Sequence, residues 1–240
     1  MLYSTYMSTM KKLVFDIETV GVEFDSLDAI SKEYLLKYAE DEEEKQDIKE
    51  RLGFYPHTGF VVAIGVYNPD TNQGGILLNP PEGIKEAPEK LNEDVTLEWG
   101  SEKEILEKFW DICNRYNYFI SFNGRGFDVP FLMIRSAIHG ITPSKDLMSN
   151  RYVSSQKFGA THVDLSDQLK FYGAFRRTFP LHIWCKAFGI ESPKEEGITG
   201  DDVAPLYKKK KMMEIAHYNS KDLTSTAELY RRWHEYLEKI

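Results

Sequence analysis

The stretch Lys11–Thr19 reads KKLVFDIET and decides the fold. Its apolar run LVF is typical of a central β-strand. Side chains two residues apart on a strand point to the same face, so Asp16 and Glu18 are aimed together, ~7 Å apart along the strand. Burying two ionised carboxylates without a counter-charge is costly, because the charged groups lose their hydration. An exposed edge strand would avoid that cost, but the apolar run favours a central strand, and we therefore expect a shared cation.

The residues after this stretch alternate between predicted strands and helices. Phe60–Tyr67 (FVVAIGVY) is the near-continuous apolar run of a buried strand. Gly74–Leu78 (GGILL) follows the turn residues of Asn68–Asn72, which predicts a hairpin. A helix, a strand and a second helix are then predicted over Ser101–Tyr116, Tyr118–Phe122 and Val129–His139. The order βββαβα indicates an α/β fold.

The other parts of the chain are predicted to be mostly helical. Periodicity over Ser26–Leu52 predicts a helical insertion between the first two strands, in which the acidic run Glu40–Glu44 forms a solvated face. Further helices are predicted over Leu165–Tyr172, Leu181–Phe188 and Val203–Leu237. We expect one domain over residues 11–240, with residues 24–55 as the insertion and residues 1–10 as a flexible N-terminus.

Composition limits the class of protein. The 240 residues are 42% hydrophobic and 28% charged, which is the mixture of an ordinary globular protein. No stretch approaches 18 consecutive apolar residues and the N-terminus lacks an apolar signal region, so we expect a cytoplasmic protein with no membrane partner. Cys113 and Cys185 lie in apolar helical patterns and are expected to be buried free thiols. The net charge of −8 argues against coating nucleic acid by bulk attraction, although metal ions held by carboxylates can supply the charge that phosphate meets.

Two further groups of polar residues accompany the acids of the first strand. Phe122–Asp128 (FNGRGFD) lies where a strand gives way to a helix, the end of an α/β sheet at which ligands gather. Its asparagine equally suits a turn and its aspartate a helix N-cap, so this motif alone is ordinary. His217–Asp222 (HYNSKD) places Tyr218 and Asp222 four residues apart, on one face of a helix.

In this order, FDIET, N-x4-D and Y-x3-D resemble the three motifs of the DEDD (DnaQ-like) 3′→5′ exonucleases. The likeness is to the DEDDy branch related to the proofreading domain of family-B DNA polymerases, and it extends over Thr58–Val66, Lys194–Val203 and Asp222–Tyr230. The resemblance implies a ribonuclease H-like fold, with a five-stranded mixed sheet flanked by helices. From the length of the chain we expect a stand-alone enzyme, because no polymerase domain fits in the remaining residues. The insertion departs from a compact exonuclease domain and leaves the entry of substrate open.

The resemblance also assigns roles to individual residues. Four acids are implied to bind two Mg²⁺ or Mn²⁺ ions: Asp16, Glu18, Asp128 and Asp222. The two ions would stabilise the attacking and leaving oxygens of a phosphoryl displacement. These acids are catalytic together with the residue that orients the attacking water. Contacts with the substrate fall to Thr19, Asn123 and Arg125.

The water-orienting residue has two candidates, because the superfamily uses either Tyr-x3-Asp or His-x4-Asp and this sequence has both. On a helix, Tyr218 lies ~40° around the axis from Asp222, whereas His217 lies ~140° away. The preceding residues Lys208–Ala216 contain no Gly or Pro, so we expect the helix to run through them. This geometry favours Tyr218 as the catalytic residue, with His217 as the alternative.

Three functions remain open at this point. The first is an exonuclease acting on single-stranded DNA, which we favour, and the second is the same chemistry on RNA, because recognition of the 2′-OH depends on local shape. The third is a catalytically inactive nucleic-acid-binding module, which has no chemical need of four acids and a tyrosine. Asp164 is expected to cap a helix, and Lys208–Lys211 to form a solvated face in preference to a phosphate grip. The sequence does not identify a protein partner.

Overall fold

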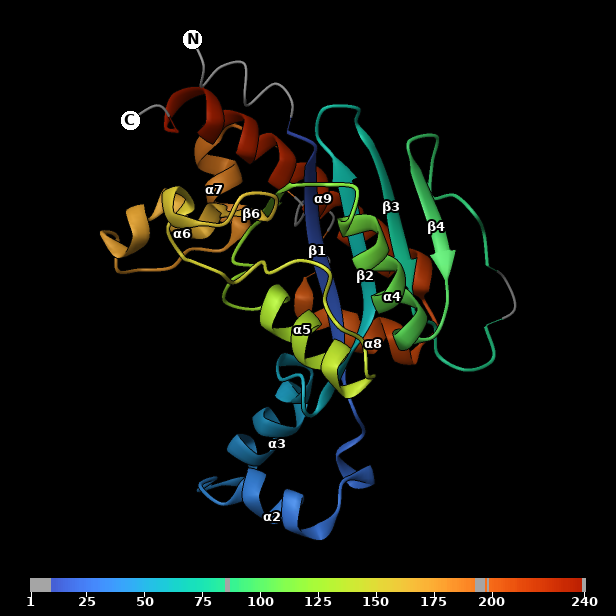
Figure 1. Cartoon of the computed structure of the whole chain (residues 1–240). Helices are drawn as coiled ribbons and strands as arrows, with labels where there is room; N and C mark the ends of the chain where they lie inside the picture. The colour runs from blue at the N-terminus through green and yellow to red at the C-terminus, as the bar shows by residue number, and fades with distance from the viewer. Residues whose placement is uncertain (1–9, 85–86, 193–196, 198, 239–240) are drawn as a thin grey trace.

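The computed structural model describes residues 10–84, 87–192, 197 and 199–238. Within these residues, six strands form one mixed sheet in the order β4-β3-β2-β1-β5-β6, with β1 and β2 at its centre (Figure 1). The strands are β1 Lys12–Gly21, β2 Gly59–Asn68, β3 Gln73–Leu78, β4 Val95–Trp99, β5 Tyr118–Ser121 and β6 Thr161–Asp164. The α/β class and the central position of the first strand are thereby confirmed.

The pairing of the strands follows the predicted pattern, with one addition. β1 and β2 are antiparallel, and so are β2 and β3, which confirms the hairpin. β5 pairs parallel with β1 on its other side, and β6 pairs parallel with β5. The expected number of five strands is wrong, because β4 adds a sixth at the edge of the sheet, parallel to β3. Its five residues alternate between buried Val95 and Leu97 and exposed Thr96 and Glu98, a pattern too short to stand out among polar neighbours.

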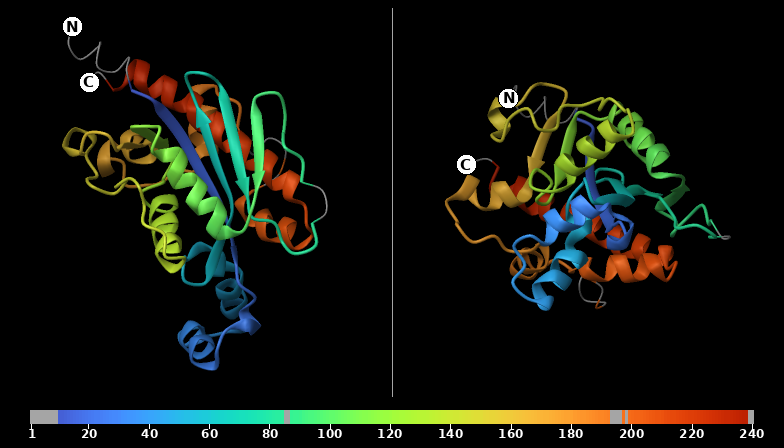
Figure 2. Two further views of the ribbon diagram at one scale, coloured as in Figure 1. Left: turned by 45° about the vertical axis from the view of Figure 1, so that its right-hand side comes forward. Right: turned by 90° about the horizontal axis from the view of Figure 1, so that it is seen from below.

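Helices cover both faces of the sheet (Figures 1 and 2). On one face, α4 (Glu102–Cys113) and α5 (Asp128–Ile138) pack on the side chains of Leu13, Phe15 and Ile17. On the other face lie α6 (Leu165–Leu169), α7 (Leu181–Phe188), α8 (Val203–Lys208) and α9 (Met212–Tyr236). The alternation along β1 thus sends Asp16 and Glu18 to the face covered by α9. Cys113 and Cys185 are buried free thiols, as predicted.

The predicted unbroken helix from Val203 to Leu237 is wrong. α8 ends at Lys208 and α9 begins at Met212, and between them Lys210 has a φ of 61°, in the left-handed region. One left-handed residue ends a helix without any help from Gly or Pro. Val203 before the break and Met212 after it are buried in the same apolar cluster, and this burial stabilises the break. A similar early stop at Leu169 shortens the helix predicted over residues 165–172, because Phe171 and Tyr172 also have positive φ.

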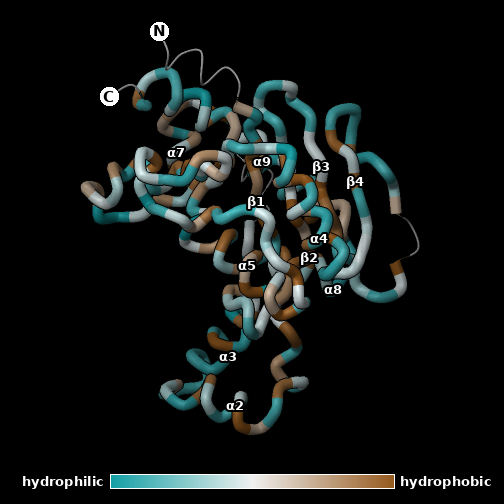
Figure 3. Tube along the Cα trace, in the orientation of Figure 1, coloured by the Kyte–Doolittle hydropathy of each residue, from teal (hydrophilic) through white to brown (hydrophobic). Residues whose placement is uncertain are grey.

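The insertion between β1 and β2 is helical, as expected, and projects from the body of the domain (Figure 1). It comprises the 3-10 helices η1 (Phe24–Ser26) and η2 (Arg51–Phe54) and the α-helices α2 (Ala29–Leu36) and α3 (Glu42–Glu50). α2 and α3 have no buried residues, and the hydropathy trace of α3 is largely hydrophilic (Figure 3). The insertion is anchored at η2, where Leu52 is buried and approaches Gly21 so closely that a Cβ there would lie 2.7 Å from the leucine Cβ.

Three expectations concern the ends and loops of the chain. The N-terminal expectation for residues 1–10 lies outside the described residues except for Met10, which packs partly buried against an apolar cluster. The resembling segment Lys194–Val203 is also partly outside them. Among the described residues, no helix combines the length and apolar character needed to cross a membrane.

Candidate active site

The two acids of β1 lie at the centre of the sheet, side by side on the face toward α9. Asp16 pairs with Gly65 of β2 and Glu18 with Ala63, and the register shifts directly after Glu18. Glu18 is only 7% exposed, and Asp16 is half-buried. The small residues on β2 leave room for another element to approach the carboxylates.

That element is α9, which carries the third acid. Asp16, Glu18 and Asp222 each offer one carboxylate oxygen, and these oxygens lie within 4.8 Å of one another. Three carboxylates at such distances repel one another unless protons or a cation separate their charges. An all-oxygen acidic set is what Mg²⁺ and Mn²⁺ prefer, so the donor chemistry fits the ions that the sequence implied.

Asp128 lies beside this group without belonging to it. It is the first residue of α5, and Phe127, not Asp128, occupies the N-cap position. Its Oδ1 accepts a hydrogen bond of 3.1 Å from the backbone N–H of Ile17, between the two acids of β1. The alternative interpretation of Asp128 as a helix cap is therefore wrong. Three of the four predicted acids converge on one position, and the fourth is held next to them by the strand itself.

The crowding of acids controls their protonation. Burial, followed by the charges of Asp128, Asp222 and Glu18, raises the pKa of Asp16 well above its ordinary value. Burial and then the charge of Asp222 raise the pKa of Glu18 in the same way. Burial raises the pKa of Asp128 to about 7. Because divalent ions bind deprotonated carboxylates, we expect metal binding to release protons and to tighten as pH rises.

The metal-free protein should therefore lose stability as pH rises. Asp128 has a pKa of about 7 in the folded chain against an ordinary value of 3.8, so its contribution is fully present below 3.8 and is lost as pH rises through 7. Asparagine resembles the protonated form, so Asp128→Asn should gain stability over the parent across this range, by about 4 kcal/mol at most. Thermal unfolding of both proteins in EDTA at a series of pH values checks this. An equal pH dependence of the two proteins would show that Asp128 does not titrate there.

Tyr218 and His217 occupy different environments on α9. The Tyr218 side chain is 8% exposed and donates a hydrogen bond to Asp222, whereas His217 is exposed. Burial, followed by the charge of Asp222, raises the pKa of Tyr218 further above its ordinary value, so its hydroxyl keeps its proton. The helix break falls before Met212, and Tyr218 and Asp222 therefore share one face as predicted. Only the tyrosine of this pair is directed at the acids.

The second motif is fixed by Asp164, at the end of β6. Its two carboxylate oxygens each accept a backbone N–H at 2.9 Å, from Asn123 and from Arg125. The same carboxylate also accepts from Ser166 and Asp167 and caps α6, as the sequence predicts. Asn123 is exposed with a φ of 62°, a left-handed conformation that asparagine tolerates better than most residues. Asp164 therefore positions the loop and is not one of the converging acids.

The three predicted substrate contacts differ in how their side chains are engaged. The guanidinium of Arg125 donates to the carbonyl oxygens of Leu147 at 3.0 Å and Met148 at 3.2 Å, so it braces a neighbouring loop. The hydroxyl of Thr19 donates to the carbonyl of Gly53 at 2.7 Å and ties β1 to the insertion. Asn123 presents an exposed side chain. Contact with substrate remains a prediction for all three.

Asn219 is a site residue that the sequence analysis missed. It is fully buried, and its Nδ2 lies 2.9 Å from Asp16 Oδ2 and 3.4 Å from Glu18 Oε1. Its position one residue after Tyr218 gave no signal, because adjacent helical residues point 100° apart and the contact depends on how α9 packs over β1. With it, two of the converging acids share one neutral hydrogen-bond donor.

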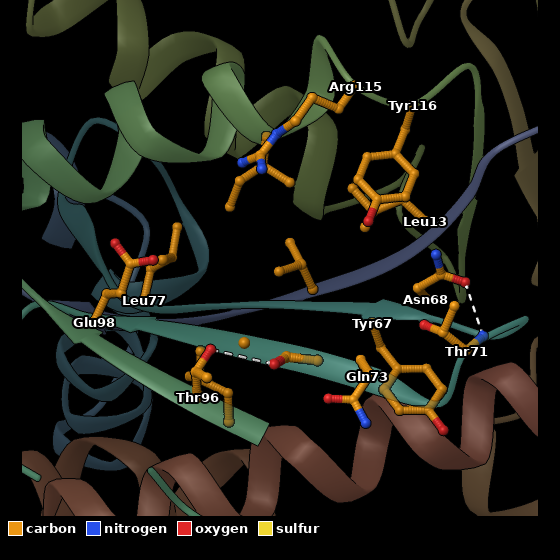
Figure 4. A pocket seen from close by; sticks show the side chains of 15 residues that line it. Leu13, Tyr67, Asn68, Thr71, Gln73, Leu77, Thr96, Glu98, Arg115 and Tyr116 are labelled. Atoms are coloured by element: carbon orange, nitrogen blue, oxygen red, sulfur yellow. Dashed lines mark hydrogen bonds between the residues drawn. The ribbon is translucent and has the colours of Figure 1, made fainter. Parts of the chain in front are cut away.

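Two cavities lie near the sheet, on different sides of it. The smaller, of about 210 Å³, is lined by Leu13, Tyr67, Arg115 and Tyr116 and lies beside the end of α4 (Figure 4). Leu13 points to the face opposite Asp16, so the sheet separates this cavity from the acids. The larger, of about 1210 Å³, begins at Thr19 and runs between the insertion and α8. It borders the end of β1 that directly follows the two acids.

Comparison with known proteins agrees with this arrangement. A family described as predicted 3′-5′ exonucleases related to the exonuclease domain of PolB matches residues 89–240, which include the second and third motifs. No curated protein matches the chain. The structure of the family B DNA polymerase from the hyperthermophilic archaeon Pyrobaculum calidifontis is similar, with a TM-score of 0.59 and 16% sequence identity.

The similarity to that polymerase covers 94% of this chain but only 24% of the polymerase. At this identity the likeness concerns the fold, which is the ribonuclease H-like arrangement that the motifs implied. The family match extends over more than half of the chain. The chain therefore belongs to the family of predicted 3′-5′ exonucleases related to the exonuclease domain of PolB.

Proposed function

We propose that this protein is a metal-dependent 3′→5′ exonuclease that hydrolyses the terminal phosphodiester bond of a single strand, with DNA as the favoured substrate. The observation that carries the proposal is the convergence of Asp16, Glu18 and Asp222 within 4.8 Å, with Asp128 fixed beside them. The preference for DNA rests on the likeness to a DNA polymerase. We also propose that it acts in the cytoplasm.

The four acids would hold two cations, Mg²⁺ or Mn²⁺. These two cations would supply positive charge to the attacking and leaving oxygens of the phosphoryl group. The carboxylates already lie together before the substrate binds, so they need not be rearranged during the reaction. The Tyr218 hydroxyl donates a hydrogen bond to Asp222, and this bond orients the phenol. Because its pKa is raised, Tyr218 would position the attacking water by hydrogen bonding and would not act as a base.

The direction of degradation tests the proposal. A single strand with a blocked 3′ end should resist the enzyme, whereas the same strand with a blocked 5′ end should shorten at the rate of the unblocked strand. The assay uses matched DNA and RNA oligonucleotides of one sequence, each with an internal label, in the presence of Mn²⁺. Faster shortening of RNA than of DNA would reassign the substrate and leave the reaction unchanged.

Two results would contradict the proposed reaction. The first is shortening that proceeds from the 5′ end when the 3′ end is blocked, and the second is internal cleavage of a circular single strand. A folded, metal-binding protein that binds both strands and shortens neither would indicate the inactive binding module.

A further inference from the structure

Asn219 lies between the two acids of β1 and joins them through one amide group. Its Nδ2 is 2.9 Å from Asp16 Oδ2 and 3.4 Å from Glu18 Oε1, so each of its two N–H bonds has a carboxylate within reach. Each carboxylate oxygen carries two lone pairs, and accepting one hydrogen bond leaves the others for a cation. The amide can therefore hold both carboxylates without displacing a metal ion.

The backbone of β2 is shaped to admit this amide. Gly65 pairs with Asp16 across the sheet, and a Cβ at Gly65 would lie 2.0 Å from Asn219 Oδ1 and 2.6 Å from Leu223 Cδ1. Even alanine at this position would push the amide away from the acids. A glycine in the middle of a buried strand weakens the strand, and here it gives the close approach of α9.

The orientation of the amide has a cost within the fold. Asn219 is 0% exposed, and its Oδ1 accepts no hydrogen bond from the described part of the chain. A buried polar atom without a partner destabilises the folded state, and an apolar side chain would avoid that cost. The amide is therefore better explained by the contacts of its N–H₂ group with the acids than by packing.

We propose that Asn219 is a positioning residue, which holds the carboxylates of Asp16 and Glu18 turned toward Asp222 so that their oxygens converge on one cation. Like-charged carboxylates repel one another, and a donor shared between two of them restricts their rotation. This inference rests on the metal site of the proposed function. It goes beyond that function because it assigns the positioning of two metal ligands to Asn219, a neutral residue that is neither one of the four acids nor the tyrosine.

Metal binding measured without substrate tests this proposal. Asn219→Ala should bind Mn²⁺ about 10- to 100-fold more weakly than the parent, as is typical when a partner that orients a metal ligand is removed. Titration calorimetry with Mn²⁺, or the dependence of the melting temperature on Mn²⁺ concentration, gives this shift. Ser225→Ala is the matched control, because Ser225 is also buried on α9 but bonds to the carbonyl of Glu191. It should retain the parental affinity.

A second change reaches the same amide from the other side. Gly65→Ala alters no polar group, yet it should weaken Mn²⁺ binding in the same direction because its Cβ displaces Asn219. If Asn219→Ala does not fold, Asn219→Ser, which keeps one hydrogen-bond donor on a shorter side chain, should show a smaller shift of the same sign. In nuclease assays the loss should be largely recovered at saturating Mn²⁺.

The outcomes separate this inference from the proposed function. Parental Mn²⁺ affinity in folded Asn219→Ala and Gly65→Ala, with lower melting temperatures alone, would show that Asn219 serves packing only and would overturn the inference. If the variants bind Mn²⁺ more weakly than the parent, and the parent degrades no nucleic acid, the inference is supported and the proposed function is removed. If the parent degrades nucleic acid and the variants bind Mn²⁺ with parental affinity, the proposed function is supported and the inference is overturned.

Discussion

Replacing Asp16 by alanine should abolish degradation of a single strand while the protein remains folded. Asp16 offers one of the three converging carboxylate oxygens, and after burial the charges of Asp128, Asp222 and Glu18 all raise its pKa. Ion-mediated stabilisation of a phosphoryl transition state is worth several kcal/mol. Its loss corresponds to a rate decrease of about 10³-fold or more. Initial rates of nucleotide release at equal Mn²⁺ give the comparison.

The same substitution should stabilise the metal-free protein, because it removes one of several crowded, partly buried charges. We expect a melting temperature in EDTA that is a few degrees higher than that of the parent. Asp70→Ala is the matched control, since Asp70 is an exposed acid that pairs with Lys12 at the start of the same strand. It should keep the parental rate. Comparable turnover by Asp16→Ala and the parent would remove the metal mechanism.

Tyr218→Phe should cost far more activity than His217→Ala, although the residues are adjacent. The phenylalanine keeps the ring buried but removes the hydroxyl that bonds to Asp222. Loss of a group that positions a nucleophile typically reduces the rate by ~10²–10⁴-fold. Metal binding should stay intact, because the converging carboxylates remain. Rates at saturating Mn²⁺ and Mn²⁺ affinities of both variants provide the measurement.

His217→Ala is the natural control for this experiment. His217 is exposed on α9 and lies about 140° around the helix from Asp222, so its loss should leave the rate near that of the parent. The opposite ranking, with an inactive histidine variant and an active tyrosine variant, would contradict the helix geometry at the site. The histidine would then act on the attacking water in place of the tyrosine.

The parts of the site that the sequence predicted follow from short-range periodicity. Asp16 and Glu18 face the same way because they are two apart on a strand, and Tyr218 and Asp222 because they are four apart on a helix. Both relations hold within one element and need no knowledge of packing. The ordered motifs then brought the two elements together through their likeness to a known family. The convergence of three acids agrees with that combination.

What the sequence did not predict depends on contacts between elements or on single dihedral angles. The contact of Asn219 with β1 and the room made by Gly65 exist only when α9 lies on the sheet. The left-handed Lys210 sits in a run of four lysines, where no residue type signals a helix break. β4 is a short, half-exposed edge strand that pairs with β3, and so few residues give only a weak strand preference of their own.

The most direct test of metal-dependent 3′→5′ exonuclease activity is digestion of a 5′-labelled single-stranded DNA by the parent protein over a range of Mg²⁺ and Mn²⁺ concentrations. The controls are the parent protein in EDTA and the Asp16→Ala variant. We predict a ladder that shortens one nucleotide at a time from the 3′ end, that requires either ion, and that is missing in both controls. Shortening that persists in EDTA or in Asp16→Ala, or intact DNA and RNA after incubation with folded parent protein and saturating metal, would contradict the account.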